Sequence, residues 1–479
     1  MQLEQVNAHH WRIPKSSMNG MRVDGTIFVS KALLASQKQD QSPQQVANVA
    51  TLPGIIGASL AMPDMHWGYG FPIGGVAAFD KDEGVISPGG VGYDINCGVN
   101  LTRTAFTDKD VLPKLKQLVD CVFATIPAGL GTGGGVPISK KEFDEVITHG
   151  AGWAVKRGLA TATDREHMEE NGCLPGADPD KASQRCRERG FDQIGTLGAG
   201  NHFVEIQVVE KIFDEAVAAA FGLFPHQICI MVHSGSRGFG YQICTESLPM
   251  MNRAADKYGI ELPDRQLACA PLQSKEGEAY FAAMKCAANY AWANRLCLRR
   301  GAMHAVMETL HATEQTASFG MVYDVSHNIA KLEKHLVNGK EREVCVHRKG
   351  ATRSLPKNHP LVPQAYRHVG QPVLIPGDMG RASWVLVGAE GAMMQSFGSA
   401  PHGAGRLLSR KQGSKLGRGE AVRESLAAQG ILVQARSHLT LAEEQPGVYK
   451  DVDEVVRVAD AAGLARPVAR LRPLGCIKG

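Results

Sequence analysis

Residues 91–100 read VGYDINCGVN, and this glycine-rich stretch holds an aspartate and a cysteine, Asp94 and Cys97, three positions apart. The flanking glycines let the backbone turn sharply, so that both side chains can face the same point. Taken alone, each residue has an ordinary explanation: Cys97 as a buried structural thiol and Asp94 as a capping or turn residue. Because carboxylate and thiolate are both metal ligands, the pair also predicts a metal site, provided that other ligands converge on it.

Four histidines are expected to follow apolar, strand-like runs, each beside Gly, Asn or Ser. They are His202 in GTLGAGNHFVEIQ (195–207), His233 in CIMVHSGSRGFG (229–240), His327 in MVYDVSHNIAK (321–331) and His402 in FGSAPHGAGRLLSR (397–410). The stretch AMPDMHWGYGFPIGG (61–75) adds Asp64 and His66. A single histidine is more often a hydrogen-bonded structural residue than a ligand. Four of them in this setting favour a shared site at the ends of strands.

These residues together predict a site for two metal ions. A Cys97 thiolate can bridge two cations, and Asp94, His202, His233 and His327 would complete the ligand sets. Paired metals about 3.5–4 Å apart are used in phosphoryl chemistry. The ligand types leave the metal open, because thiolate favours zinc whereas carboxylate and imidazole equally suit manganese.

Basic residues in Gly- and Ser-containing stretches predict a ligand that carries phosphate. They are Arg237 in SGSRG (234–238), Arg348, Lys349 and Arg353 in HRKGATR (347–353), and Arg406 and Arg410 in PHGAGRLLSR (401–410). A solvated surface explains any one cluster equally well. The chain has no GxxxxGK[ST] motif, and GAGNHF (198–203) lacks the third glycine of a dinucleotide-binding turn, so P-loop and Rossmann sites are excluded.

Composition indicates a folded protein in a reducing compartment. The chain has 479 residues, of which 44% are hydrophobic and 21% charged, and its net charge of +4 is too small to indicate a polyanionic partner by itself. Its 11 cysteines form no CxxC pair, and the N-terminus has no apolar leader. No apolar run approaches the ~18 residues of a membrane span. We expect a soluble, cytoplasmic protein.

Hydrophobic patterning favours an α+β or irregular α/β fold, with α+β as the predicted class. Helices are expected at 109–125 and 274–312, and strands at 54–62, 203–209, 227–233, 320–325, 372–375 and 384–387. Segments 127–137 and 171–186 are expected to be surface loops, the second a solvated insertion. With no repeat and no long linker, residues 1–479 are expected to form a single catalytic domain of mixed sheets flanked by helices around a deep cleft. The first 50 residues are the least informative.

With these motifs in hand, the sequence resembles the RtcB family of RNA-splicing ligases. The matching stretches are MPDMHWGYGFPIGG, GVGYDINCGVN, GTLGAGNHFVEI, HSGSRG, YDVSHNIAK, HRKGATR, SAPHGAGR and the terminal CIKG, which follow in family order from about residue 61 to the end. The resemblance implies an RtcB-type domain that joins RNA 3′-phosphate or 2′,3′-cyclic phosphate ends to 5′-hydroxyl ends with GTP and two manganese ions, in tRNA splicing or RNA repair. Such RNA ends are the implied partner, an archease-like activator is a further candidate, and no membrane is involved.

The resemblance also assigns roles to residues. Asp94, Cys97 and His202 would hold one manganese, and Cys97, His233 and His327 the other. His402 would be the nucleophile that becomes guanylylated. The residues implied to line the GTP site are Asn201, His202, Phe203, Val204, Glu205, His327, Asn328, Pro376, Gly377, Asp378, Met379, Ser383, His402, Gly403, Ala404, Gly405 and Lys478.

Asp378 departs from the family pattern, where a small hydroxyl residue is expected, and a carboxylate beside a nucleotide would repel it. Two other functions compatible with these motifs are a binuclear metal phosphoesterase that opens RNA cyclic phosphates without ligation, and a non-catalytic RNA-binding module. The lack of clustered aromatic residues for base stacking counts against the second.

Overall fold

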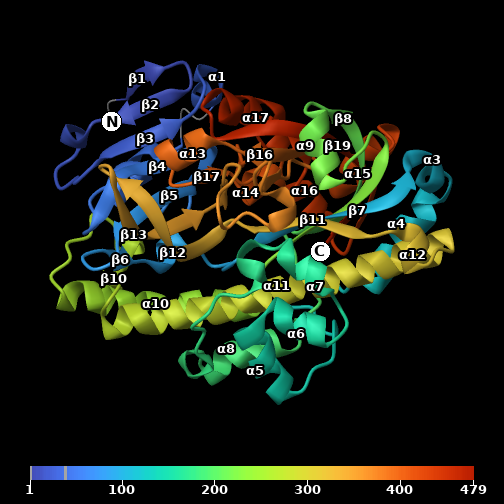
Figure 1. The fold of residues 1–479 in the computed structure, drawn as a ribbon, viewed down its shortest axis with the longest axis horizontal. Helices are drawn as coiled ribbons and strands as arrows, with labels where there is room; N and C mark the ends of the chain where they lie inside the picture. Colours follow the sequence, from blue (N-terminus) through green and yellow to red (C-terminus); the bar gives the residue numbers. More distant parts are fainter. Residues whose placement is uncertain (1–2, 37–39) are drawn as a thin grey trace.

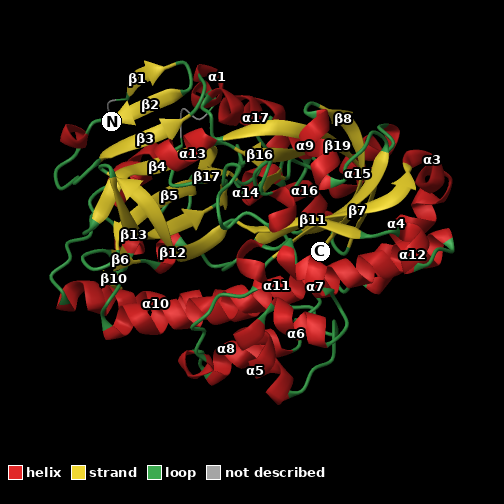
Figure 2. Ribbon diagram, viewed as in Figure 1, coloured by secondary structure: helices red, strands yellow, loops and turns green. Residues whose placement is uncertain are grey.

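Two large, mostly antiparallel sheets form the centre of the structure, which is a computed structural model that describes residues 3–36 and 40–479 (Figures 1 and 2). The first sheet has the strand order β1 (Glu4–Asn7), β2 (His10–Ile13), β3 (Asp24–Phe28), β4 (Ile55–His66), β5 (Ile73–Asp80), β13 (Lys340–Lys349), β12 (Asn328–Val337). The second has the order β11 (Gly320–Ser326), β7 (Gly98–Thr107), β9 (Gln227–Ser234), β8 (Phe203–Ile212), β19 (Ala465–Lys478), β16 (Ser383–Gly388), β15 (Pro372–Ile375), with β18 (Leu432–Ala435) also pairing with β19.

Two short pairs of strands complete the β structure: β6 (Val85–Ile86) with β10 (Ala270–Pro271), and β14 (Ala351–Arg353) with β17 (Ser399–Pro401). In the two large sheets, only β3–β4 and β18–β19 pair in parallel among the described strands. β9, β15 and β16 are buried along their whole length, and β4, β5, β7, β8 and β11 contain long buried stretches. This explains why they read as continuous apolar runs rather than as alternating patterns.

Two long helices, α10 (Arg237–Lys257) and α11 (Lys275–Leu310), lie across one side of the sheets (Figures 1 and 2). α11 begins at Ser274, whose hydroxyl accepts a hydrogen bond from the Gly277 amide, and ends at His311, which takes a left-handed conformation. The 36 residues of this helix span about 54 Å. Its alanine-rich interior lets neighbouring helices pack closely, and most of the helix is buried.

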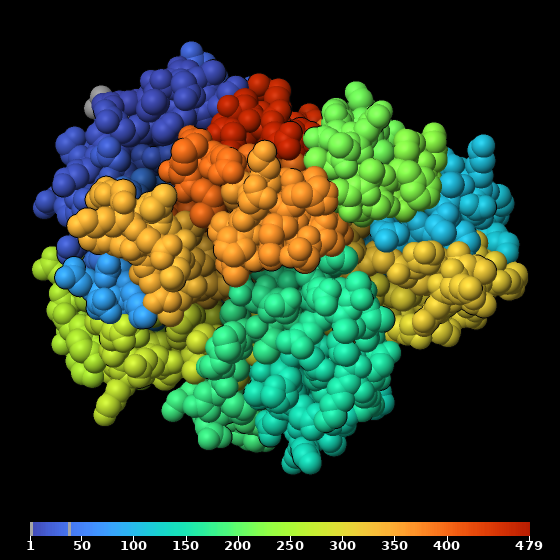
Figure 3. All heavy atoms as spheres, in the orientation of Figure 1, coloured from blue at the N-terminus to red at the C-terminus, as the bar shows by residue number. Residues whose placement is uncertain are grey.

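The remaining helices lie around the sheets and the two long helices. Helices α5 (Lys140–His149), α6 (Ala151–Lys156) and α8 (Gln184–Phe191) project beyond the two long helices, where Figure 3 shows a distinct lobe. The others are α1 (Lys31–Ala35), α2 (Ser42–Val49), α3 (Asp108–Val111), α4 (Leu115–Thr125), α7 (Ala162–Glu166), α9 (Glu215–Phe221), α12 (Glu314–Ala317), α13 (Glu390–Gln395), α14 (Arg410–Gly413), α15 (Gly419–Ala428), α16 (His438–Glu443) and α17 (Val452–Ala461).

The α+β class is confirmed, and the predicted strands and the helix expected at 274–312 are present with ends shifted by a few residues. The helix expected at 109–125 is interrupted, because α3 ends at Val111, a 3-10 turn covers residues 112–114 and α4 begins at Leu115. Segment 127–137 is irregular, as expected. Segment 171–186 is largely exposed and irregular before α8, as expected of a surface loop, but Leu174 and Cys186 anchor it in the largest apolar cluster and α8 begins within it. The single-domain prediction stays a prediction. Among the described residues, no helix has the length and apolar character that crossing a bilayer requires.

Candidate active site

The predicted metal ligands meet at one end of four neighbouring strands, β11, β7, β9 and β8. His233 is the penultimate residue of β9, where it is paired with Val99 of β7 on one side and with Phe203 of β8 on the other. Cys97 comes directly before β7 and His202 directly before β8, whereas His327 directly follows β11. Because adjacent antiparallel strands run in opposite directions, ligands from strand starts and strand ends share the same edge.

The prediction that all four histidines follow strands is therefore wrong for His202, which precedes β8. The apolar run after His202 forms the strand, and the glycine-rich stretch before it forms the turn. In an antiparallel sheet this difference does not move the histidine away from the others.

The donor atoms form two groups that share the Cys97 sulfur. In the first group, the His202 Nε2 atom lies 2.8 Å from Asp94 Oδ2 and 3.3 Å from Cys97 Sγ. Both groups hold their ligand atoms within 4.8 Å of one another.

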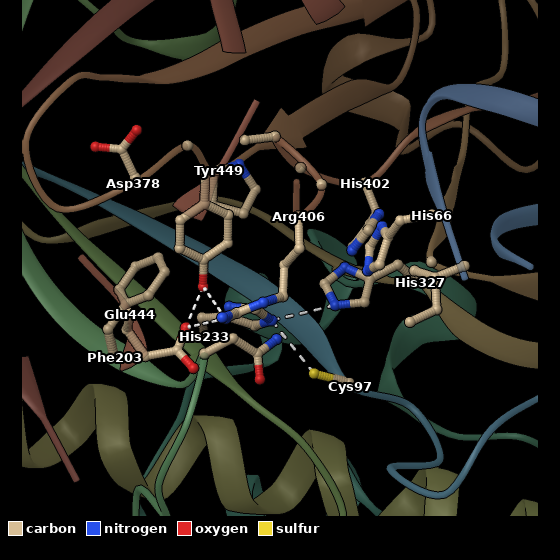
Figure 4. Close-up of a pocket in the computed structure, with 18 of the residues that line it drawn as sticks. His66, Cys97, Phe203, His233, His327, Asp378, His402, Arg406, Glu444 and Tyr449 are labelled. Carbon is tan, nitrogen blue, oxygen red and sulfur yellow. Dashed lines mark hydrogen bonds and ion pairs between the residues drawn. The ribbon is translucent and has the colours of Figure 1, made fainter. Parts of the chain in front are cut away.

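In the second group, the His233 Nε2 atom lies 3.2 Å from Cys97 Sγ and 3.2 Å from His327 Nε2 (Figure 4). Two buried imidazole nitrogens that face each other compete for a single proton between them. A cation at this point would satisfy both nitrogens and the thiolate. The donor set therefore fits a metal ion.

The protonation states of these ligands suit a metal. Burial and the neighbouring histidines hold the pKa values of His233 and His327 well below the usual range, so both rings are neutral. Although burial opposes ionisation of Asp94, His202 and Arg237 keep the pKa of that carboxyl at about 2. Burial and Asp94 raise the pKa of the Cys97 thiol, so its thiolate form requires a cation at the site.

A buried arginine on α11 forms hydrogen bonds to the segments that carry the metal ligands. The Arg295 guanidinium donates to the Asn96 carbonyl at 2.6 Å and to the Ser234 carbonyl at 3.1 Å, next to the ligands Cys97 and His233. It also forms a fully buried ion pair with Asp324 of β11 at 2.7 Å. One side chain thus connects three segments that are far apart in the sequence.

His402 lies beside the second ligand group, and Asp64 of β4 orients its ring. The ring centroids of His402 and His327 are 4.9 Å apart. The Asp64 Oδ2 atom accepts from His402 Nδ1 at 2.6 Å, and from the backbone amides of His402 at 2.9 Å and Gly403 at 3.2 Å. With the Nδ1 proton held by the carboxylate, the Nε2 lone pair of His402 is free to act as a nucleophile.

A cavity of about 300 Å³ opens in front of His402 and the second ligand group. The lining residues that the sequence predicted are Cys97, Asn201, Phe203, Glu205, His233, His327, Asn328, Lys349, Pro376, Gly377, Asp378, Met379, His402, Gly403, Ala404, Gly405, Arg406, Arg410 and Lys478. Asp94 and His202 do not line the cavity. They belong to the first ligand group, which shares Cys97 with the second. Val204 points to the opposite side of β8, into an apolar cluster, so only its backbone faces this region.

Four polar side chains lie at one end of this region: Glu205, Gln207, Ser383 and Lys478. Burial raises the pKa of Glu205 to about 7, although Gln207 and Lys478 oppose the shift. Gln207 bridges the Glu205 carboxyl at 2.8 Å and the Ser383 hydroxyl at 3.0 Å, which places Ser383 behind Glu205. The Lys478 ammonium lies 3.2 Å from the Gly200 carbonyl and faces the Phe203 ring at 5.6 Å.

The Asp378 carboxylate is turned away from the histidines (Figure 4). Its Oδ1 atom accepts from the Gly380 amide at 2.9 Å, and its Oδ2 atom lies 3.6 Å from the Arg381 guanidinium. Burial raises the pKa of this carboxyl to about 6. The expected repulsion of a nucleotide is thereby reduced, because the side chain contacts its own turn and the backbone lines the cavity.

Two of the predicted phosphate-binding arginines lie elsewhere. Arg348 is fully buried and pairs with Glu333 at 2.5 Å, and Arg353 pairs with Glu170 at 2.5 Å. Neither is among the lining residues of the cavity. Each neutralises a carboxylate within the protein, so we remove both from the predicted phosphate-binding set.

The other predicted cations remain near the cavity. Arg237 approaches His202, and the space it occupies exists because Gly198 has no side chain: a Cβ atom there would lie 2.0 Å from the guanidinium. Arg410 lies close to Gly200, where a Cβ atom would be 2.5 Å from its guanidinium. The glycines of the 198–200 turn, both with positive φ, thus make room for two arginines. The Lys349 ammonium donates to backbone carbonyls of Tyr69 and Phe71.

Five lining residues lie within the quoted motifs but were not predicted for the site: Tyr69, Ile73, Gly92, Tyr93 and Gly350. Two more, Glu444 and Tyr449, contact Arg406 (Figure 4). They lie between the recognised motifs, and no spacing pointed to them. Asp64 was noted as a candidate, but no local pattern linked it to a histidine 338 positions later.

The fold and the site define an α+β protein whose central cavity joins paired metal-ligand groups, one shared cysteine and a carboxylate-oriented histidine. The family model described as tRNA-splicing ligase RtcB matches residues 45–479. The chain is 53% identical over 477 residues to the tRNA-splicing ligase RtcB of Thermococcus kodakarensis, covering 100% of this chain and 99% of that relative. It is 52% identical over 438 residues to the RNA-splicing ligase RtcB of Mycobacterium tuberculosis, covering 91% of this chain and 100% of that relative. The chain belongs to the RtcB family.

Proposed function

We propose that this protein is an RNA ligase that joins RNA 3′-phosphate or 2′,3′-cyclic phosphate ends to 5′-hydroxyl ends, using GTP and Mn²⁺, in RNA splicing or repair. Its relatives are named as splicing ligases. The observation that carries the proposal is the Asp64–His402 pair beside two metal-ligand groups that share Cys97. A phosphoesterase that only hydrolyses cyclic phosphates needs the metal ligands but gives no reason for an oriented histidine in this position.

His402 supplies the nucleophile in the proposed first step. Its Nε2 atom attacks the α-phosphorus of GTP, a P–N bond forms, and the bond to the β-phosphate oxygen breaks with release of pyrophosphate. Asp64 stabilises the positive charge that the imidazole gains as this bond forms. Metal ions held by Asp94, Cys97, His202, His233 and His327 would supply neutralisation of phosphate charge.

The GMP group then passes to the RNA. An oxygen of the RNA 3′-phosphate attacks the phosphorus, the P–N bond to His402 breaks, and the histidine regains its lone pair. The 5′-hydroxyl attacks the activated 3′-phosphorus, a phosphodiester bond forms and GMP leaves. A cyclic phosphate is first hydrolysed by water to the 3′-phosphate.

Glu205, Lys478 and Ser383 are proposed to select guanine. Guanine presents N–H donors that a buried carboxylate accepts, and its O6 atom accepts from an ammonium or hydroxyl group. Pairing with these donors would favour the ionised form of Glu205 and lower its raised pKa. The Pro376–Met379 turn and Gly403–Gly405 offer backbone groups to the rest of the nucleotide.

The test is incubation with labelled GTP and each of several divalent metals. We expect an acid-labile protein–GMP adduct, with most label in Mn²⁺, that is lost in His402→Ala. A matched control is His304→Ala, because His304 is an exposed histidine of α11 that only approaches Glu308 at 3.8 Å. Stable labelling of His402→Ala would reject this nucleophile, and turnover of cyclic phosphate without GTP and without joined product would favour the phosphoesterase.

A further inference from the structure

A second hollow of about 900 Å³ adjoins the central cavity. The two share four lining residues: His66, Ile73, Arg406 and Arg410. A polymer whose end lies at His402 has to leave the central cavity, and this hollow shares part of its wall with that cavity. Its volume lies within the usual range for ligand sites.

An exposed tryptophan lies at the wall of this hollow. Trp67 is 58% exposed, whereas Trp153, Trp292 and Trp384 are buried. A large aromatic ring left in water beside a cavity is typical of a binding surface. Nucleic-acid bases stack on such rings with little dependence on base identity.

The backbone around Trp67 is held rigidly on both sides. The buried Gln45 side chain donates to the Gly68 carbonyl at 2.6 Å and accepts from the Gly68 amide at 3.0 Å. On the other side, His66 Nδ1 contacts the Asp64 carbonyl at 3.0 Å. The backbone that carries the indole is therefore held in place before any ligand binds, which reduces the entropy lost on binding.

Another part of the wall is basic. Segment 405–418, which includes α14, carries five cations and no carboxylate: Arg406, Arg410, Lys411, Lys415 and Arg418. Arg406 and Arg410 line the hollow itself, with Arg406 paired to Glu444. Asp40 is the one acidic residue among the described residues of the wall. Cations facing an exposed aromatic ring suit a nucleotide, whose phosphate and base they contact separately.

We propose that this hollow binds a nucleotide of the single-stranded RNA adjoining the reacting end, with its base stacked on Trp67. The inference rests on the proposed function, since it assumes that an RNA end reaches His402. Either strand, the one ending in 3′-phosphate or the one beginning with 5′-hydroxyl, presents the same base chemistry, so the experiment treats them separately.

The test compares Trp67→Ala and Trp67→Phe in steady-state ligation, with each RNA strand varied in turn. Loss of one stacked base weakens binding roughly 5- to 150-fold. We expect the KM for one strand to rise by this factor in Trp67→Ala and to stay near the wild-type value in Trp67→Phe, which keeps a ring. The strand whose KM changes is the one that occupies the hollow.

GTP labelling of both variants should equal that of the wild type, because Trp67 does not line the central cavity. Phe224→Ala provides a matched control, since Phe224 is also an exposed aromatic residue and lines neither hollow. Unchanged KM values for both strands in a Trp67→Ala protein that still ligates would overturn the inference.

A fluorescence titration needs no turnover and separates the two proposals. A 3′-phosphorylated or a 5′-hydroxyl RNA oligonucleotide should quench the tryptophan emission of the wild type, and the quenching should be lost in Trp67→Phe. Equal quenching in both proteins would reject stacking on Trp67. Failure of the wild type to label with GTP or to join RNA would reject the proposed function, and the titration would still decide the stacking site.

Discussion

Replacing Asp64 by asparagine tests how the carboxylate acts on His402. The Oδ2 atom accepts three hydrogen bonds, two of them from backbone amides that need an acceptor. The buried Oδ1 atom has no hydrogen-bond partner in the described part of the chain. An asparagine would therefore place its oxygen at the Oδ2 position and its NH₂ group at the Oδ1 position. His402 would keep its Nδ1 proton and its free Nε2 lone pair, and the change would remove only the negative charge.

The size of the effect follows from the charge that develops during the attack. A full positive charge on the imidazole, about 4 Å from the carboxylate charge, gains about 4 kcal/mol at an effective dielectric constant of about 20. With roughly half of that charge developed in the transition state, Asp64→Asn loses about 2 kcal/mol, or about 30-fold in the rate of adduct formation. Asp64→Ala should lose more, because it also leaves the two backbone amides without an acceptor.

The assay is single-turnover formation of the protein–GMP adduct with saturating GTP and Mn²⁺. Asp82→Asn, which removes an exposed carboxylate, is the control and should react at the wild-type rate. A loss near 10⁴-fold in Asp64→Asn would mean that the amide turns its NH₂ toward the ring and imposes the wrong tautomer, as in a serine protease triad. That result, or an unchanged rate, would refute the reasoning.

Three further predictions concern the ligands and their support. Cys97→Ala should abolish metal binding at both ligand groups by metal analysis after loading with Mn²⁺, whereas Cys269→Ala, which removes another buried thiol, should not. Arg295→Met should lower the free energy of unfolding by about 3–5 kcal/mol because it leaves Asp324 buried without its partner, and Arg295→Met/Asp324→Leu should recover most of the loss in the urea midpoint. Burial raises the pKa of Glu205 from 4.5 to about 7. Between these two pH values the native state binds more protons than the unfolded state, so the free energy of unfolding falls as the pH rises from the lower value to the higher. Glu205→Gln should remove that loss of stability, which is worth up to about 3 kcal/mol between pH 5 and 8. Urea denaturation over this pH range measures it, and equal pH dependence in both proteins would contradict the prediction.

The local elements were predictable because each rests on a short pattern. Apolar runs bounded by glycine or polar residues gave the strands, and Ser274 before an alanine-rich run gave the start of α11. Two of the predicted phosphate-binding arginines show what short patterns do not reveal. Arg348 and Arg353 occur in a basic, glycine-containing stretch that predicts phosphate binding. Their partners, Glu333 and Glu170, come from other segments, so the sequence does not distinguish a buried ion pair from a free cation.

Strand register, which no short motif encodes, decides whether the metal ligands meet. Side chains alternate between the two faces of a strand, so a one-residue slip of β9 would turn His233 away from Cys97 while leaving every motif intact. The bonds from Arg295 to the Asn96 and Ser234 carbonyls oppose such a slip, because they hold the start of β7 and the end of β9 at fixed positions against α11. Arg295 contributes no metal ligand, yet it constrains where two of them lie. The Arg295→Met/Asp324→Leu variant separates these roles: if register depends on the two carbonyl contacts, it should regain stability without regaining full metal affinity.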